Sequence, residues 1–180
     1  GRSALRALLA TTAALALAGA LLSAPSPAAA ATADDGCDPI DPASCLLPFP
    51  NDWYTVRDAR TDTGRRVNLR TTLRNALGMP IRPDEWNRSD GFSPGSMLLA
   101  HVPGVDLARS GAAPITDIGA SLRRDAPIVI LDAATGERWP YWAELDANAT
   151  RDDRRALIVR PARNFREGHR YVVALRRLRD

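Results

Sequence analysis

The stretch PIVILDAATGERWPYWAEL, residues 127–145, decides the fold. Its apolar run at 128–131 is bounded by Pro127 and Asp132, which is typical of a strand in a protein core. The small and polar residues that follow predict a hairpin turn, and residues 138–145 are expected to return as the partner strand. The sequence therefore predicts an antiparallel hairpin at the centre of the domain.

Further short strands are expected on both sides of this hairpin. Residues 97–102, 156–159 and 171–175 are apolar runs between turn-forming residues, and residues 53–69 read as two short strands around a turn. Short helical turns are expected in the connections, but long helices do not alternate with the strands as they do around a parallel sheet. The pattern predicts an all-β antiparallel β-sandwich.

The connection before the last strand carries a signal for an immunoglobulin-like type of sandwich. In RNFREGHRYVVAL, residues 163–175, Phe165 precedes Gly168, which precedes Tyr171 at the head of the strand. A corner tyrosine occupies that place in immunoglobulin-like domains, and its hydroxyl bonds back to upstream backbone. We therefore expect an Ig-like β-sandwich over residues 53–180.

The N-terminus has the order of regions found in a secretory signal peptide. Arg2 and Arg6 precede an apolar run at 7–22, and a helix-breaking stretch of small residues follows. The run is shorter than the about 20 residues that a membrane span requires. We expect residues 1–33 to be a signal peptide cleaved before Asp34, and the mature chain to be extracellular without a transmembrane anchor.

The two cysteines, Cys37 and Cys45, lie just inside the expected mature N-terminus. Export favours a disulfide over two free thiols, and the spacing of the pair does not match the C-x-x-C of metal or redox sites. We expect a Cys37–Cys45 disulfide that closes the N-terminal segment 34–52.

The charge of the chain argues against nucleic acid as a partner. The formal net charge is +3, and loss of Arg2 and Arg6 with the signal peptide lowers it to +3 − 2 = +1. A nucleic-acid footprint requires basic residues gathered on one face, and no run of like charge in the sequence is long enough to suggest one.

Residues 90–96, DGFSPGS, contain the Gly-x-Ser-x-Gly pattern of a nucleophile elbow, with Ser93 at its centre. The residues before Ser93 favour a turn where the elbow needs a strand, and the next residue is Pro94, which has no N–H for an oxyanion hole. One such donor is worth roughly 3 kcal/mol of barrier. We expect a loop here and assign no catalytic residue, and a serine hydrolase using Ser93 is the least favoured alternative.

The two histidines are the other candidate acid–base groups. His101 falls in an apolar strand, where a half-buried, hydrogen-bonded side chain is expected, and His169 is expected to be exposed on a turn. Residues 146–157 resemble half of a calcium loop, but Arg151 and Leu157 stand where an EF-hand requires Gly and Glu. We assign no metal ligand and no cofactor, and an irregular calcium site stays as an alternative.

The aromatic residues Trp139, Tyr141 and Trp142 allow a binding interpretation. On a strand, Trp139 and Tyr141 share one face and Trp142 takes the other. Exposed rings would stack on sugars or a hydrophobic ligand, whereas buried rings would form the core. The chain has only 4 Trp, 3 Tyr and 3 Phe, so the core requires most of them and burial is favoured.

Three motifs carry a resemblance to a known family: LLPFPND at 46–52, DTGRRVNL at 62–69 and DGFSPGS at 90–96. The chain resembles, over about residues 37–180, the N-terminal domain of secreted bacterial lipases of the "virulence factor lipase" type. It is also similar to uncharacterised exported proteins of GC-rich bacteria that share this domain. The resemblance implies a non-catalytic Ig-like module, truncated from a longer protein, ahead of a hydrolase or another domain beyond Asp180.

Two functions follow as hypotheses besides the Ser93 hydrolase. The leading one is an exported accessory module whose partner is a downstream domain of the same polypeptide, lipase- or esterase-like. The alternative is a cell-surface module that binds glycan, cell-wall or lipid ligands on its own through the aromatic residues at 139–142.

Overall fold

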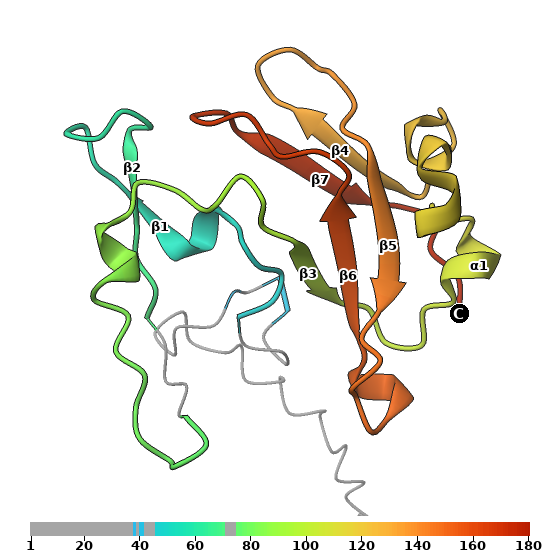
Figure 1. The fold of residues 1–180 in the computed structure, drawn as a ribbon, viewed down its shortest axis with the longest axis horizontal. Helices are drawn as coiled ribbons and strands as arrows, with labels where there is room; N and C mark the ends of the chain where they lie inside the picture. Colours follow the sequence, from blue (N-terminus) through green and yellow to red (C-terminus); the bar gives the residue numbers. More distant parts are fainter. Residues whose placement is uncertain (1–37, 39, 42–45, 71–74) are drawn as a thin grey trace, which may run out of the picture. The chain divides into compact units, whose positions relative to one another are not determined.

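The computed structural model describes residues 38, 40–41, 46–70 and 75–180 (Figure 1). All of them belong to one unit, Ala31–Asp180. The expected signal peptide and both cysteines, Cys37 and Cys45, lie outside the described residues, so the cleavage site and the disulfide stay predictions. In the described part, no helix is long and apolar enough to cross a membrane.

Within these ranges the chain forms seven strands and five short helices. The strands are β1 (Thr55–Arg57), β2 (Arg65–Val67), β3 (Leu98–His101), β4 (Ile128–Asp132), β5 (Tyr141–Leu145), β6 (Ala156–Pro161) and β7 (Tyr171–Leu175). The α-helix is α1 (Leu107–Ser110), and the 3-10 helices are η1 (Asp52–Tyr54), η2 (Trp86–Arg88), η3 (Ile115–Leu122) and η4 (Asp152–Arg154).

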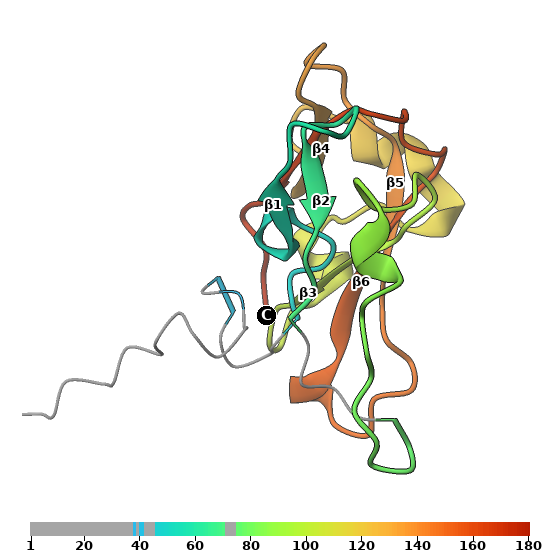
Figure 2. The same cartoon turned by 90° about the vertical axis from the view of Figure 1, so that its left-hand side faces the viewer.

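The described strands form small antiparallel sheets. Strand β6 lies between β3 and β5, and β4 pairs with β7 (Figure 1). The hairpin of β1 and β2 forms a separate pair, which faces the viewer in Figure 2. In the middle sheet, Val159 of β6 lies opposite Leu98 on one side and Ala143 on the other. The prediction of a β-rich antiparallel fold is confirmed, and the immunoglobulin-like sandwich stays a prediction.

The central turn forms as the sequence predicts, but the expectation that residues 138–145 return as the partner strand of β4 was wrong beyond its first residues. Arg138 bridges Leu131 and the N–H of Trp139 bonds to Ile130 O at 2.8 Å, whereas β5 pairs with β6 in the three-stranded sheet. The N–H of Gly136 bonds to Asp132 O at 2.8 Å to close the turn, and Gly136 has a φ of 71°, which a residue without Cβ adopts at little cost. The return strand was expected to begin at residue 138, but regular pairing starts at Tyr141. The interruption falls at Pro140, which has no N–H to donate to a ladder.

The first short strand also begins later than expected. Residues Asp52–Tyr54 form the 3-10 helix η1 because the side chain of Asn51 accepts a 2.7 Å hydrogen bond from the N–H of Trp53. Such N-cap bonds satisfy a backbone donor that the helix itself leaves unpaired. The expectation of a strand from residue 53 was therefore wrong for its first two residues.

Residues of the three-stranded sheet and of the β4–β7 sheet form the core. Ile128 and Ile130 of β4 are 0% and 1% exposed, and Leu157 of β6 is 0% exposed. Complete burial of one such side chain contributes about 1.5–3 kcal/mol to folding. Tyr141 of β5 lies in the same core, where its hydroxyl donates a 2.8 Å hydrogen bond to the carbonyl of Ile128. Burial raises the pKa of Tyr141 to about 12.

The free edge of β3 is covered by an upstream residue. Phe49 and Leu99 exchange two backbone hydrogen bonds, of 2.8 Å and 2.7 Å. The ring of Phe49 also contacts the ring of Phe92, with centroids 5.4 Å apart. One residue of the N-terminal segment therefore closes this side of the three-stranded sheet.

Candidate functional site

Among the described residues, the largest connected network of ion pairs lies where two turns meet. One turn joins β4 to β5, and the other connection joins β6 to β7. The turn cluster consists of Asp132, Glu137, Arg163, Arg166 and His169, linked by the ion pairs described below.

Asp132 is the centre of the turn cluster. Its side chain is 0% exposed, and its Oδ2 accepts hydrogen bonds from Arg166 Nη1 at 2.7 Å and from His169 Nδ1 at 2.8 Å. Its Oδ1 accepts from the N–H of Ala134 at 2.9 Å. Burial acts to raise the pKa of the Asp132 carboxyl, but the hydrogen bonds outweigh it and lower the pKa to about 2. The group is therefore ionised at neutral pH.

Glu137 at the far end of the same turn completes the ion pairs. It accepts a 2.6 Å hydrogen bond from Arg166 Nη2 and a further bond from Arg163. The guanidinium of Arg163, followed by that of Arg166, lowers the pKa of the Glu137 carboxyl. Because Arg166 bonds both Glu137 and Asp132, one side chain of the β6–β7 connection holds both ends of the β4–β5 turn.

Trp139 lies beneath this charged layer. It is 2% exposed, and the guanidinium carbon of Arg163 lies 3.7 Å from its ring centroid. Its ring also meets those of Phe165 and Tyr171, with centroids 6.1 Å and 5.1 Å away. A cation over an indole face is attractive by about 0.5–2 kcal/mol. The arrangement packs the β6–β7 connection onto the core.

Tyr171 makes the backward bond expected of a corner tyrosine. Its hydroxyl accepts a 2.9 Å hydrogen bond from the N–H of Arg166. Gly168, between these two residues, has a φ of 70°, which favours glycine. The contact fixes the turn that carries Arg166 and His169.

The alternative aromatic ligand site at residues 139–142 is not an exposed row of rings, and burial was the favoured interpretation. Trp139 and Tyr141 are 2% and 0% exposed, and Tyr141 is buried by the core described above. Trp142 is half-buried on β5. Trp139 and Tyr141 therefore pack in the hydrophobic core.

His169 and Asp132 form a carboxylate–imidazole pair of the kind that orients a general base. In a hydrolase, the free Nε2 of such a histidine faces a nucleophile. Among the described residues, the His169 ring makes its hydrogen bond to Asp132. Arg166 bonds to the same carboxylate oxygen, so that oxygen is shared between a guanidinium and the imidazole.

Ser93 lies on an exposed turn that the structure ties together locally. Its Oγ accepts a 3.3 Å hydrogen bond from the N–H of Gly95, and its carbonyl accepts one of 2.9 Å from Ser96. The carbonyl of Pro94 accepts from the N–H of Phe165 at 2.9 Å, which attaches the loop to the β6–β7 connection. The structure does not bring the Ser93 hydroxyl into a hydrogen bond with either histidine within the described residues.

His101 lies apart from the turn cluster. It is half-buried, its Nε2 is 2.7 Å from the carbonyl of Asp153, and its Nδ1 is 3.6 Å from Asp41 Oδ2. In the expected calcium-like stretch, Asp146 Oδ1 accepts from the N–H of Asn148 at 2.8 Å, which is a local turn bond. Within the described ranges, no group of three or more His, Cys, Asp or Glu is placed to hold a metal ion.

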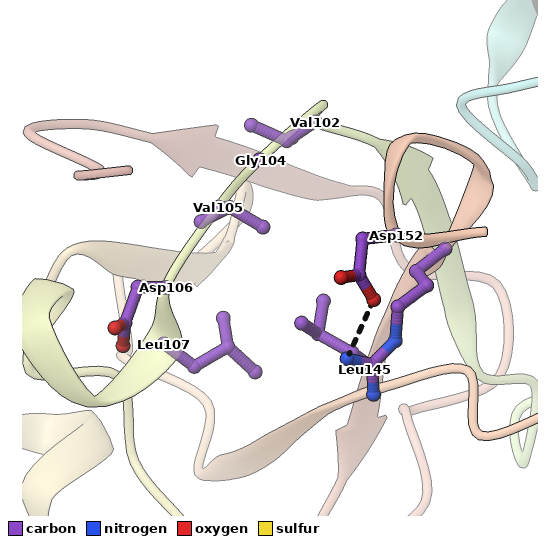
Figure 3. Close-up of a pocket in the computed structure, with 8 residues that line it drawn as sticks. Val102, Gly104, Val105, Asp106, Leu107, Leu145 and Asp152 are labelled. Carbon is purple, nitrogen blue, oxygen red and sulfur yellow. Dashed lines mark ion pairs between the residues drawn. The ribbon is translucent and has the colours of Figure 1, made fainter.

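An open pocket of about 390 Å³ lies between the β3–α1 loop and the residues around η4 (Figure 3). Its lining residues are Val102, Gly104, Val105, Asp106, Leu107, Leu145, Asp152 and Arg155. Arg155 Nη1 lies 3.7 Å from Asp152 Oδ1, drawn as the dashed line. The pocket combines aliphatic residues with two carboxylates, Asp106 and Asp152, and one guanidinium, Arg155.

Sequence reasoning missed the turn cluster because its members come from two separate turns. Asp132 and Arg166 are 34 residues apart, and no spacing rule connects them. The usable signal was compositional, since two acids flank the β4–β5 turn and the β6–β7 connection is rich in Arg. No family model matches the chain, and neither does any curated protein or any solved structure.

Proposed function

We propose that the mature chain is a non-catalytic accessory module of an exported protein, carried ahead of a lipase- or esterase-like domain. The observation that carries the proposal is the use of the turn cluster. Arg166 and His169 both bind the buried carboxylate of Asp132, so the groups best able to do chemistry hold two turns together.

The state of His169 supports this proposal over a catalytic role. A general base acts on a proton within about 3 Å, in reach of a nucleophile or a bound substrate. The Ser93 hydroxyl, at the centre of the Gly-x-Ser-x-Gly pattern, accepts a hydrogen bond within its own turn. The partner carboxylate of His169 is also bound by the guanidinium of Arg166, which suits a contact that holds the two turns together.

The burial of Trp139 and Tyr141 weakens the alternative of a glycan-binding module. Carbohydrate platforms require ring faces open to solvent, and these two rings are almost fully enclosed. Trp86 is 58% exposed, but it lies on η2, away from β5 in the chain. Residues 139–142 therefore do not form an exposed row of rings on which a sugar could stack.

The absence of catalysis is tested with short-chain and long-chain p-nitrophenyl esters and the purified chain. We expect no hydrolysis above buffer and no change with Ser93→Ala or His169→Gln. Ester hydrolysis that disappears in either variant, at an unchanged melting temperature, would contradict the accessory role.

The export part of the proposal has a separate test. N-terminal sequencing and intact mass of the protein from culture medium are expected to show a chain that begins near Asp34 and extends past Asp180. Mass before and after reduction reports the Cys37–Cys45 disulfide as a gain of two hydrogen atoms, the two protons and two electrons that the reductant supplies. A protein retained in the cells with its first residues intact would contradict export.

A further inference from the structure

Strand β7 is apolar and exposed, which is unusual for a strand at the edge of a sheet. Val172, Val173 and Leu175 are 54%, 42% and 39% exposed. Among the described strands, β7 pairs with β4 alone. Its edge therefore differs from that of β3, which Phe49 covers.

The register shows which backbone groups of β7 are open. The N–H of Ala133 bonds to Arg170 O at 2.8 Å, and the N–H of Arg176 bonds to Pro127 O at 2.8 Å. Hydrogen-bonded pairs recur every second residue in an antiparallel ladder, so even-numbered residues of β7 bond toward β4. Tyr171, Val173 and Leu175 consequently direct their N–H and C=O groups outward. Such a row is a template for one more strand.

The charges around β7 select the kind of strand that fits. Arginines stand at 170, 176, 177 and 179, and no acidic residue lies between positions 170 and 179. Arg170 pairs with Asp52, but Arg176 is held by the carbonyls of Ala126 and Arg124. Within the described residues, Arg177 and Arg179 have no carboxylate partner. An incoming strand with acidic residues beside the C-terminal end of β7 would meet arginines that have no carboxylate partner among the described residues.

The same charges oppose pairing with a second copy of the chain. An antiparallel pair of β7 strands centred on Val173 places Arg170 of one copy opposite Arg176 of the other, at both ends. A parallel pair brings identical arginines side by side. Like charges directly opposite one another destabilise a sheet. A second copy is therefore a poorer occupant than an acidic segment.

We propose that β7 is a docking edge for an extended polypeptide segment with alternating apolar residues and with Asp or Glu at the end that lies beside Arg177 and Arg179. The segment adds as a strand beside β7, bonds to the backbone of Tyr171, Val173 and Leu175, and places its carboxylates near Arg177 and Arg179. The inference deepens the proposed accessory function by naming the chemistry of its partner, and it rests on that function.

Peptide binding to the full chain tests the edge directly. The probe is a fluorescein-labelled peptide, Asp-Asp-Val-Thr-Val-Thr-Val-Glu-Glu, and the matched control replaces its four acidic residues with Lys. Anisotropy at low salt is expected to show at least about tenfold tighter binding of the acidic peptide, because rim charges steer and select partners. Equal affinity of the two peptides, or no binding of either, overturns the proposal.

Two variants at Val173 distinguish binding through the backbone of β7 from binding through the side chain. Val173→Pro removes an outward N–H that β4 does not use, and proline is tolerated at such edge positions. Binding is expected to weaken about tenfold, since an edge hydrogen bond is lost and the ring obstructs the approach. Val173→Thr keeps the N–H and the β-branched shape and is expected to bind nearly as the parent does. Equal weakening by both variants contradicts backbone pairing.

Hydrogen exchange keeps the proposal testable if Val173→Pro does not fold. In the parent chain, the amides of Tyr171, Val173 and Leu175 are expected to exchange fast alone and slowly with the acidic peptide. Those of Val172 and Ala174, which face β4, are expected to be protected in both states. Protection of the outward amides without peptide, together with a dimer in sedimentation, overturns the acidic-segment proposal in favour of a second copy.

The ester assay described above distinguishes this inference from the proposed function. Hydrolysis by the chain with peptide binding intact contradicts the non-catalytic role and leaves the docking edge. Loss of selective peptide binding with no hydrolysis contradicts the docking edge alone.

Discussion

The hydroxyl of Tyr141 on β5 donates a 2.8 Å hydrogen bond to the carbonyl of Ile128 on β4, and both residues are 0% exposed. Ile128 is the first residue of its strand, so this bond attaches the start of β4 to the start of β5 through the core. A polar contact at such a depth is costly to leave half-made, because the acceptor has no water to replace its donor.

Tyr141→Phe is therefore expected to lower the free energy of unfolding by about 1–3 kcal/mol, the cost of an unsatisfied buried carbonyl. The ring remains, so packing changes little. Urea denaturation measures the loss, and Tyr171→Phe is the matched control. The hydrogen bond of that hydroxyl is exposed, so a smaller loss is expected. Equal losses of unfolding free energy in both variants would contradict a larger contribution from the hydrogen bond to Ile128.

Acid stability is expected to depend on Asp132. Its folded pKa is about 2, below the about 3.9 of an unfolded aspartate. A group with a depressed pKa stabilises the fold above its unfolded pKa, and this contribution is lost as pH falls from about 4 toward about 2. Glu137, whose pKa is also lowered, acts in the same direction.

Asp132→Asn is expected to flatten the dependence of the melting temperature on pH in that window and to lower it at pH 7. Thermal scans between pH 2 and 7 measure both effects. Asp84→Asn, at a side chain that is 66% exposed, serves as the control. An unchanged acid limb in Asp132→Asn would show that other carboxylates control acid unfolding.

Trp139→Ala is expected to cost about 3–5 kcal/mol of stability, the range for truncation of a large buried aromatic residue. The change removes the platform on which Arg163 rests, in addition to core contacts. Chemical denaturation measures the loss. Trp86→Ala, at a residue 58% exposed, is expected to stay within about 0.5 kcal/mol. Similar costs for both would contradict the burial of Trp139.

Two glycine substitutions test the central turn. Gly136→Ala is expected to destabilise the protein by about 1–2 kcal/mol, because a Cβ is strained at a φ of 71°. Gly91→Ala is expected to be neutral or stabilising by up to about 1 kcal/mol, since its φ lies outside the left-handed region and no atom lies within 4 Å of the added Cβ. Calorimetry compares the two, and a loss in Gly91→Ala as large as in Gly136→Ala would contradict the turn geometry.

The strands were predictable where local pattern and tertiary role agree. Residues 171–175 and 128–131 are short apolar runs between polar turns, and both lie within strands of nearly the same bounds. The exposure of β7 was not predictable, because an apolar run of five residues looks the same in a core and at an edge. Only the tertiary contacts of the strand distinguish a core strand from an edge strand.

The candidate site was less predictable for a different reason. Arg166 recognises Asp132 and Glu137 through the spatial approach of two turns, and that approach is set by the β4–β7 pairing. The role of Trp139 was predictable from scarcity, since few aromatic residues are available to fill a core. Its contact with Arg163 depends on how the β6–β7 connection folds back, which no periodicity describes.

The pairing of Phe49 with Leu99 has a consequence for the order in which the chain is made. Phe49 leaves the ribosome before β3, β5 and β6, so the residue that covers the edge of β3 is present when that sheet first assembles. Strand β7 is synthesised after every other described strand. Within the described residues, no upstream segment pairs with its second edge. Synthesis from the N-terminus thus supplies the residue that covers the edge of β3 before that strand is made.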